Sequence, residues 1–255
     1  MALDMPCHSC GTYCHMVSSA KVDQKVRQRR FAPAGRISRS GPELRLIEAA
    51  LSSGLLYRRS SHPIIFREPA LPTGFPDLVA VYPRASRKAV SSPARNLLTP
   101  KHLRLLHHLV ATGPNTRAQL ETALAWPSRS LKLHLEALAS AELVEPRYDK
   151  LVARSISRIF WAQKIVAIEA KVSSWRDALQ QAVANTWFAS HSYILLPALR
   201  SLEQVKHEAF ALGIGVMVLK GSNLRVALPP RVCSIPASYG SWLVNEWLVR
   251  SMNEE

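Results

Sequence analysis

A regular alternation of apolar strand-like runs and amphipathic helices in residues 164–219 is the feature that most constrains the fold. KIVAIEAKV is β-rich, SWRDALQQAVANTWFA follows with helical spacing, and the order repeats in SYILLP, ALRSLEQVKHEAFALG and IGVMVLK. Gly213 stands where the second of these helices should end. Strands that alternate with helices of this length form a sheet with helices crossing over it. The sequence therefore predicts an α/β fold.

Residues 42–98 add a helix and two strands to this pattern. PELRLIEAALSS, residues 42–53, is expected to be a helix, with Ser40 and Glu43 in the positions of a capping box. HPIIFREPAL and FPDLVAVYP are short, β-rich and bounded by proline, so both are expected to be strands. Glu48 lies on the apolar stripe of the helix, which leaves two interpretations: an acid at the edge of the core, or one that points into a site.

Residues 99–160 have a different character, with three helices followed by two strands. TPKHLRLLHHLVAT and SRSLKLHLEALASA begin at the cap residues Thr99 and Ser128, and NTRAQLETALA lies between them. ELVEPRYDKLVARSI is expected to be a hairpin around a tight turn at residues 148–150. Three helices followed by a hairpin is the order of a winged helix-turn-helix.

Such a geometry would place a helix in the major groove of DNA and a wing on the backbone. The third helix would expose Arg129, Ser130, Lys132 and His134, and the wing would carry Arg147, Lys150, Arg154 and Arg158. The alternative is that the segment only packs against the neighbouring domain or a protein partner.

The charge of the chain favours a polyanionic partner. The formal net charge is +15 and the pI is about 10.2, so nucleic acid is the first candidate. A membrane surface ranks lower, because no basic amphipathic helix has bulky aromatic anchors and no apolar run approaches the ~18 residues of a bilayer span. Residues 1–41 are expected to be a basic arm, either lying on phosphates or solvated.

The four cysteines have no disulfide framework, which favours a reducing, cytoplasmic setting. Cys7 and Cys10 have the spacing of half a zinc site, in CHSCGTYCH. A second C-x-x-C pair is absent from the sequence, so zinc is not expected at the N-terminus.

The strand IVAIEAKV carries a glutamate and a lysine two positions apart. Side chains two apart on a strand point to the same face, so Glu169 and Lys171 are expected to lie together. A buried ion pair is costly unless its attraction repays the desolvation, so a structural strand gains little from one. The pair is therefore either a surface salt bridge or part of an active site. Asp77, at the start of an upstream strand, is a candidate third member.

The order and context of these residues resemble the PD-(D/E)XK nuclease superfamily, whose core runs helix, three strands, helix, strand. FPDLVAV, IVAIEAK, ALQQA and SYILLP carry the resemblance, which covers residues 42–83 and 161–219. Asp77 and Glu169 are further apart than in the usual hairpin, so residues 99–160 are interpreted as an insertion at its tip. The resemblance implies a restriction-endonuclease-like mixed sheet flanked by helices, with an inserted winged helix. The expected domains are an arm at 1–41, the nuclease core at 42–98 and 161–255, and the inserted domain at 99–160.

The resemblance also implies roles for individual residues. Asp77, Glu169 and the backbone carbonyl of Ala170 would hold Mg²⁺ or Mn²⁺, and Lys171 would contact the scissile phosphate and orient the nucleophile. Glu48 would bind a water or a second metal ion, and Gln181, or less favoured Gln180, would position the substrate or Lys171. These roles predict a metal-dependent DNA nuclease, acting as a homodimer or in a larger defence or processing complex. The alternatives are a non-catalytic DNA-binding or regulatory protein with the same fold, and a scaffold that binds protein.

Overall fold

The structure, a computed structural model, describes residues 35, 41–57, 62–84 and 92–253. The expectations for the basic arm, including the Ser40 cap and the Cys7–Cys10 pair, lie outside these residues. No helix in the described part of the chain is long and apolar enough to cross a bilayer.

A mixed six-stranded sheet forms the larger part of the molecule, with the strand order β1-β2-β6-β7-β8-β9. Strands β6, β7 and β8 run parallel, and the other neighbours pair antiparallel. Helices flank the sheet, so the predicted α/β class with a mixed sheet is confirmed. The strands are β1 Ile64–Arg67, β2 Leu78–Pro83, β6 Ala162–Ala170, β7 His191–Pro197, β8 Gly215–Lys220 and β9 Asn223–Leu228.

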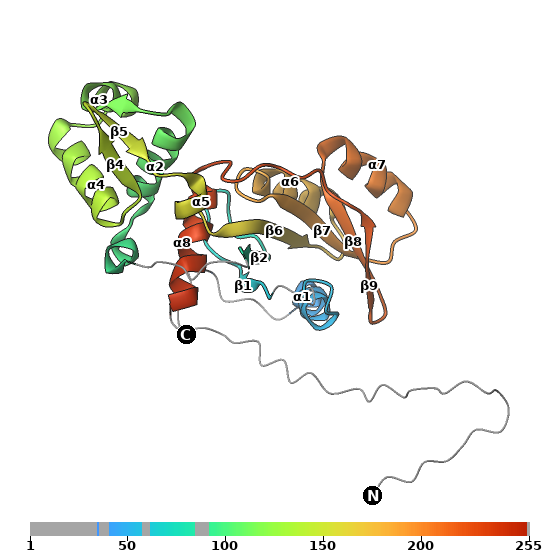
Figure 1. Cartoon of the computed structure of the whole chain (residues 1–255). Helices are drawn as coiled ribbons and strands as arrows, with labels where there is room; N and C mark the ends of the chain where they lie inside the picture. The colour runs from blue at the N-terminus through green and yellow to red at the C-terminus, as the bar shows by residue number, and fades with distance from the viewer. Residues whose placement is uncertain (1–34, 36–40, 58–61, 85–91, 254–255) are drawn as a thin grey trace, which may run out of the picture.

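Helices cover both faces of this sheet (Figure 1). Helix α1, Pro42–Ser52, packs on one face, where Val166 and Ile168 of β6 join its core. Helices α6, Trp175–Asn185, and α7, Leu202–Leu212, pack on the other face. Consecutive residues of a strand point to opposite faces, so both faces of a central strand must be apolar here. Gly213 ends α7 in the left-handed conformation, as expected.

Three helices and a small antiparallel sheet, all within residues 100–153, lie on one side of the larger sheet (Figure 1). Thr99 stands at the N-cap of α2, as expected, but α4 begins at Ser128 with Pro127 at its N-cap, so the Ser128 cap is wrong. The short strand β3 was not anticipated. The elements are α2 Pro100–Thr112, β3 Asn115–Thr116, α3 Arg117–Leu124, α4 Ser128–Ser140, β4 Val144–Arg147 and β5 Lys150–Ala153, with the sheet order β3-β5-β4.

Helix α8, Tyr239–Asn253, lies between this helical unit and the sheet (Figure 1). Its Trp247 packs against Phe66 of β1, and its Trp242 packs edge-on against Phe160, just before β6. One apolar cluster includes residues of α2, α4, α8, β2 and β6. The helical unit therefore shares its core with the sheet through α8.

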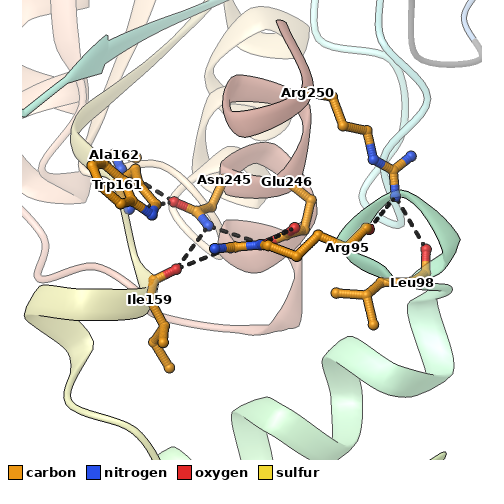
Figure 2. Close-up of polar contacts among 8 residues, drawn as sticks. All are labelled: Arg95, Leu98, Ile159, Trp161, Ala162, Asn245, Glu246 and Arg250. Carbon is orange, nitrogen blue, oxygen red and sulfur yellow. Dashed lines mark hydrogen bonds and ion pairs between the residues drawn. The ribbon is translucent and has the colours of Figure 1, made fainter. Parts of the chain in front are cut away.

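A buried polar network joins α8 to the two chain segments that connect the helical unit to the sheet (Figure 2). The outgoing segment holds the 3-10 helix Pro93–Leu97, where the Arg95 guanidinium pairs with both carboxylate oxygens of Glu246. The returning segment holds α5, Ile156–Ile159, and the Ile159 carbonyl accepts bonds from Arg95 and Asn245. Asn245 Oδ1 also accepts from the Trp161 amide at 2.6 Å. The network therefore fixes both connections to one helix.

Candidate active site

Two of the predicted site residues meet where β2 begins and β6 ends. Leu78 pairs with Ile168, so one step further along this antiparallel ladder Asp77 comes beside Glu169. Asp77 Oδ2 accepts a hydrogen bond of 2.7 Å from the Ala170 amide. The neighbouring strands thus bring together residues that are 92 positions apart in the sequence.

Asp77 lies in an environment that disfavours its charge. Burial raises the pKa of the Asp77 carboxyl, and the nearby carboxylates of Glu43 and Glu68 raise it further. The Ala170 hydrogen bond and the Lys171 ammonium lower the same pKa, but the net shift is upward. A positive charge placed near Asp77 would therefore stabilise the ionised form of its carboxyl group.

Glu169 is held from the helix that follows its strand. The residue is 4% exposed, and its Oε1 accepts a hydrogen bond of 2.6 Å from Asn185 Nδ2 at the end of α6. The Ser192 hydroxyl of β7 donates to the Ala182 carbonyl at 2.7 Å, which ties α6 to the sheet next to this contact. The Asn185 bond therefore ties the Glu169 carboxylate to the end of α6.

Lys171 contacts a different acid from the one expected. It lies just beyond the end of β6, and its Nζ is 3.3 Å from Glu43 Oε1 in the first turn of α1. Glu169 reaches α6 and Lys171 reaches α1, and these helices cover opposite faces of the sheet (Figure 1). The expectation that Glu169 and Lys171 lie together on one face is therefore wrong. Strand β6 ends at Ala170, so the alternation of side chains between the two faces does not continue to Lys171.

The first helix also presents a different glutamate. Glu48 is exposed, whereas Glu43 is half-buried beside Lys171. The two lie five positions apart, which on a helix places them well apart around the axis. Glu43 was expected only as a capping residue, but Gly41 stands at the N-cap and no side chain caps the helix there.

The glutamines of α6 do not occupy the buried face of that helix. Gln180 and Gln181 are both exposed, and Asn185 is the α6 residue bonded to Glu169. The spacing of Ala178, Ala182 and Asn185 places a polar residue on the buried stripe of α6. This spacing was the sequence signal for Asn185, and it was missed.

The oxygen atoms that could act as metal ligands at this site suit a hard cation. Carboxylate oxygens and backbone carbonyls are the ligands of Mg²⁺, which keeps several of its waters and needs few protein groups. No group of three or more His, Cys, Asp or Glu side chains has metal-binding geometry within the described ranges. Asp77 and Glu169 would therefore have to act as a pair, completed by backbone oxygens and water. The raised pKa of Asp77 fits such a cation, because its charge would offset the burial.

The residues predicted to contact DNA divide into exposed and engaged side chains. The exposed ones are Arg129 of α4, Arg147 and Lys150 of the hairpin, and Arg158 of α5, whereas Ser130 is half-buried. Lys132 of α4 is exposed as well, but its Nζ lies 3.8 Å from Glu136 on the same helix. Arg154 is 3.3 Å from Glu145 and 3.8 Å from Glu142, so two acids engage it.

His134 does not project from the exposed face of α4, as it was expected to. Its ring packs 4.7 Å from His102 and 5.0 Å from Trp126, measured between ring centroids. Burial lowers the pKa of His134, and nearby Lys101 lowers it further. His134 is therefore part of the packing between α2 and α4.

In comparisons with known proteins, no family model, no curated protein and no solved structure matches the chain.

Proposed function

We propose that the protein is a divalent-metal-dependent nuclease of the PD-(D/E)XK type, which hydrolyses phosphodiester bonds, most readily in DNA. The observation that carries the proposal is the junction of β2 and β6. Asp77, bonded to the Ala170 amide, lies beside Glu169 in the strand register, and Lys171 follows directly. The order of helix, strands and helices around this junction agrees with a restriction-endonuclease-like core.

The residues of the chain would divide the work of phosphodiester hydrolysis. When bound, Mg²⁺ or Mn²⁺ would supply Lewis-acid activation of water and neutralise charge on phosphoryl oxygens. Asp77, Glu169 and the Ala170 carbonyl would hold it, Asn185 would orient Glu169, and Glu43 would orient Lys171. The Lys171 ammonium would bind the scissile phosphate and stabilise its developing charge.

Substrate binding is assigned to the helical unit as a winged helix. Its third helix α4 and its hairpin carry exposed basic side chains, in a chain of net charge +15. Arg129 and Lys132 on α4, with Arg147 and Lys150 on the hairpin, would contact phosphates or base edges. The buried network around Arg95 and Glu246 would hold this unit in a fixed position relative to the site.

The experiment is incubation of the purified protein with supercoiled plasmid and with single-stranded DNA, in Mg²⁺, Mn²⁺ or EDTA. Cleavage is expected in the metal-containing reactions only, and Asp77→Ala and Lys171→Ala should abolish it. Cutting that survives both substitutions contradicts the proposed site. A salt-dependent shift of DNA without cleavage, in any metal, would instead favour a non-catalytic DNA-binding protein.

A further inference from the structure

The tip of the β4–β5 hairpin carries a tyrosine in an unusual conformation. Arg147 pairs with Lys150, so Tyr148 and Asp149 form a two-residue turn between them. Tyr148 has a φ of 58°, in the left-handed region. Two-residue hairpin turns with a positive φ at the first central position favour glycine there, and a bulky side chain is an outlier. The sequence thus retains a strained aromatic residue where glycine would be relaxed.

The Tyr148 ring gains nothing from packing in return. The residue is 97% exposed, so the ring extends into solvent from the end of the hairpin. Strained backbone positions that the local packing does not explain occur where function requires the side chain. Tyr148 is therefore best explained by a partner that contacts the ring.

The charges around the ring indicate what kind of partner this is. Arg147 and Lys150 are cross-strand neighbours and are both exposed, and Thr116 of β3 pairs with Lys150 on the other side. Arg117, which follows Thr116, is also exposed, so three cations outnumber the single acid Asp149 at this end of the sheet. An exposed aromatic face among cations binds a nucleobase by stacking, while the cations hold the adjacent phosphates.

Stacking on a ring requires an accessible base face. Bases within a duplex present only their edges in the grooves, whereas unpaired bases expose their faces. We infer that Tyr148 is a stacking platform for an unpaired base, so that the substrate is a nucleic acid in which a duplex adjoins unpaired nucleotides. The inference rests on the proposed nuclease function and narrows its substrate class.

The test compares a duplex carrying an unpaired tail with the same duplex having blunt ends. Affinities are measured by fluorescence anisotropy in EDTA, so that no strand is cut. Tyr148→Gly should weaken binding of the tailed duplex by roughly fivefold or more, and should barely change binding of the blunt duplex. Tyr148→Phe keeps the ring and should bind both probes like wild type. Phe210→Ala removes a ring that is 74% exposed on α7 and should change neither affinity.

Thermal unfolding gives a second measurement. If Tyr148 only stabilised the hairpin, its replacement by glycine would lower the melting temperature. Tyr148→Gly relieves the positive φ, so its melting temperature should equal or exceed that of wild type. A lower melting temperature, unchanged affinity for the tailed duplex, or equal loss for both probes overturns the inference. Metal-dependent cleavage that still requires Asp77 would leave the nuclease function standing in each of these cases.

Discussion

Single residues at the junction of β2 and β6 support the proposed function, and the half-buried Asp77 is the most informative of them. Its pKa is raised by burial and by two neighbouring acids, so ionised Asp77 destabilises the folded state. A structural role would not need a charge at this position. The sequence identified Asp77 because proline and aspartate precede an apolar strand, but its partners depend on strand register, which the sequence leaves open.

Replacement of Asp77 by asparagine should therefore stabilise the protein while it abolishes cleavage. Asparagine retains an oxygen that can accept the Ala170 N–H bond but carries no charge to bury. Since the folded pKa lies above the unfolded one, the wild-type penalty develops as the pH rises from the unfolded to the folded value and is complete above it. Urea unfolding should show the largest gain at neutral pH and little at a pH below the ordinary carboxyl range. A gain that does not depend on pH would contradict this cause.

Asn185 should be the α6 residue on which Glu169 depends. Asn185→Ala removes the donor to a buried carboxylate, so the free energy of unfolding should fall by about 1–3 kcal/mol and cleavage should weaken. Gln181→Ala is a matched control on the same helix, because Gln181 is exposed, and should stay within about 0.5 kcal/mol of wild type. The opposite ranking in urea unfolding would contradict the role given to Asn185.

For helix α1, the sequence predicts the element itself but not the direction in which its side chains point. The apolar spacing of residues 42–53 predicted the helix, which spans Pro42–Ser52, but it did not predict which of two glutamates faces Lys171. That choice depends on how α1 is rotated on the sheet, which tertiary packing decides. Strand β9 was also missed, although NLRVAL follows β8 after the two-residue turn at Gly221 and Ser222, which is a hairpin signal in the sequence.

The two glutamates of α1 give a paired test of this assignment. Glu43→Ala should lower kcat by roughly 10- to 100-fold, because Lys171 loses the group 3.3 Å away that orients it. Glu48→Ala removes an exposed carboxylate from the same helix and should leave kcat near wild type. Steady-state cleavage assays separate the two, and loss of activity in Glu48→Ala alone would restore the sequence-based choice.

Helix α8 should be the element that couples the helical unit to the sheet. Glu246→Ala leaves the Arg95 guanidinium buried without its acid, so unfolding should be easier by about 3–5 kcal/mol. The double replacement Arg95→Met with Glu246→Leu removes both charges and should recover most of that loss. Denaturant unfolding of Arg95→Met, Glu246→Leu and the double variant measures the coupling between Arg95 and Glu246, and additive losses in this cycle would argue against it.

For the whole molecule, the sequence predicted the class of fold, but it did not predict how the helical unit packs against the sheet. The two α/β segments and the helical segment between them follow from hydrophobic periodicity, which is local. The proposed inserted domain, however, shares one apolar cluster with α8 and the sheet, and no periodicity reports such a contact. The candidate active site depends in the same way on chain segments brought together by the sheet.

A cation site at Asp77 and Glu169 can be measured by calorimetric titration of Mn²⁺. The metal is titrated into wild type, Asp77→Asn and Glu169→Gln, each with a non-cleavable phosphorothioate DNA present. We expect Mn²⁺ to bind wild type, and we expect this binding to be lost or greatly weakened in each variant, with both variants still folded. Equal binding in all three proteins, or no binding in any, would contradict it.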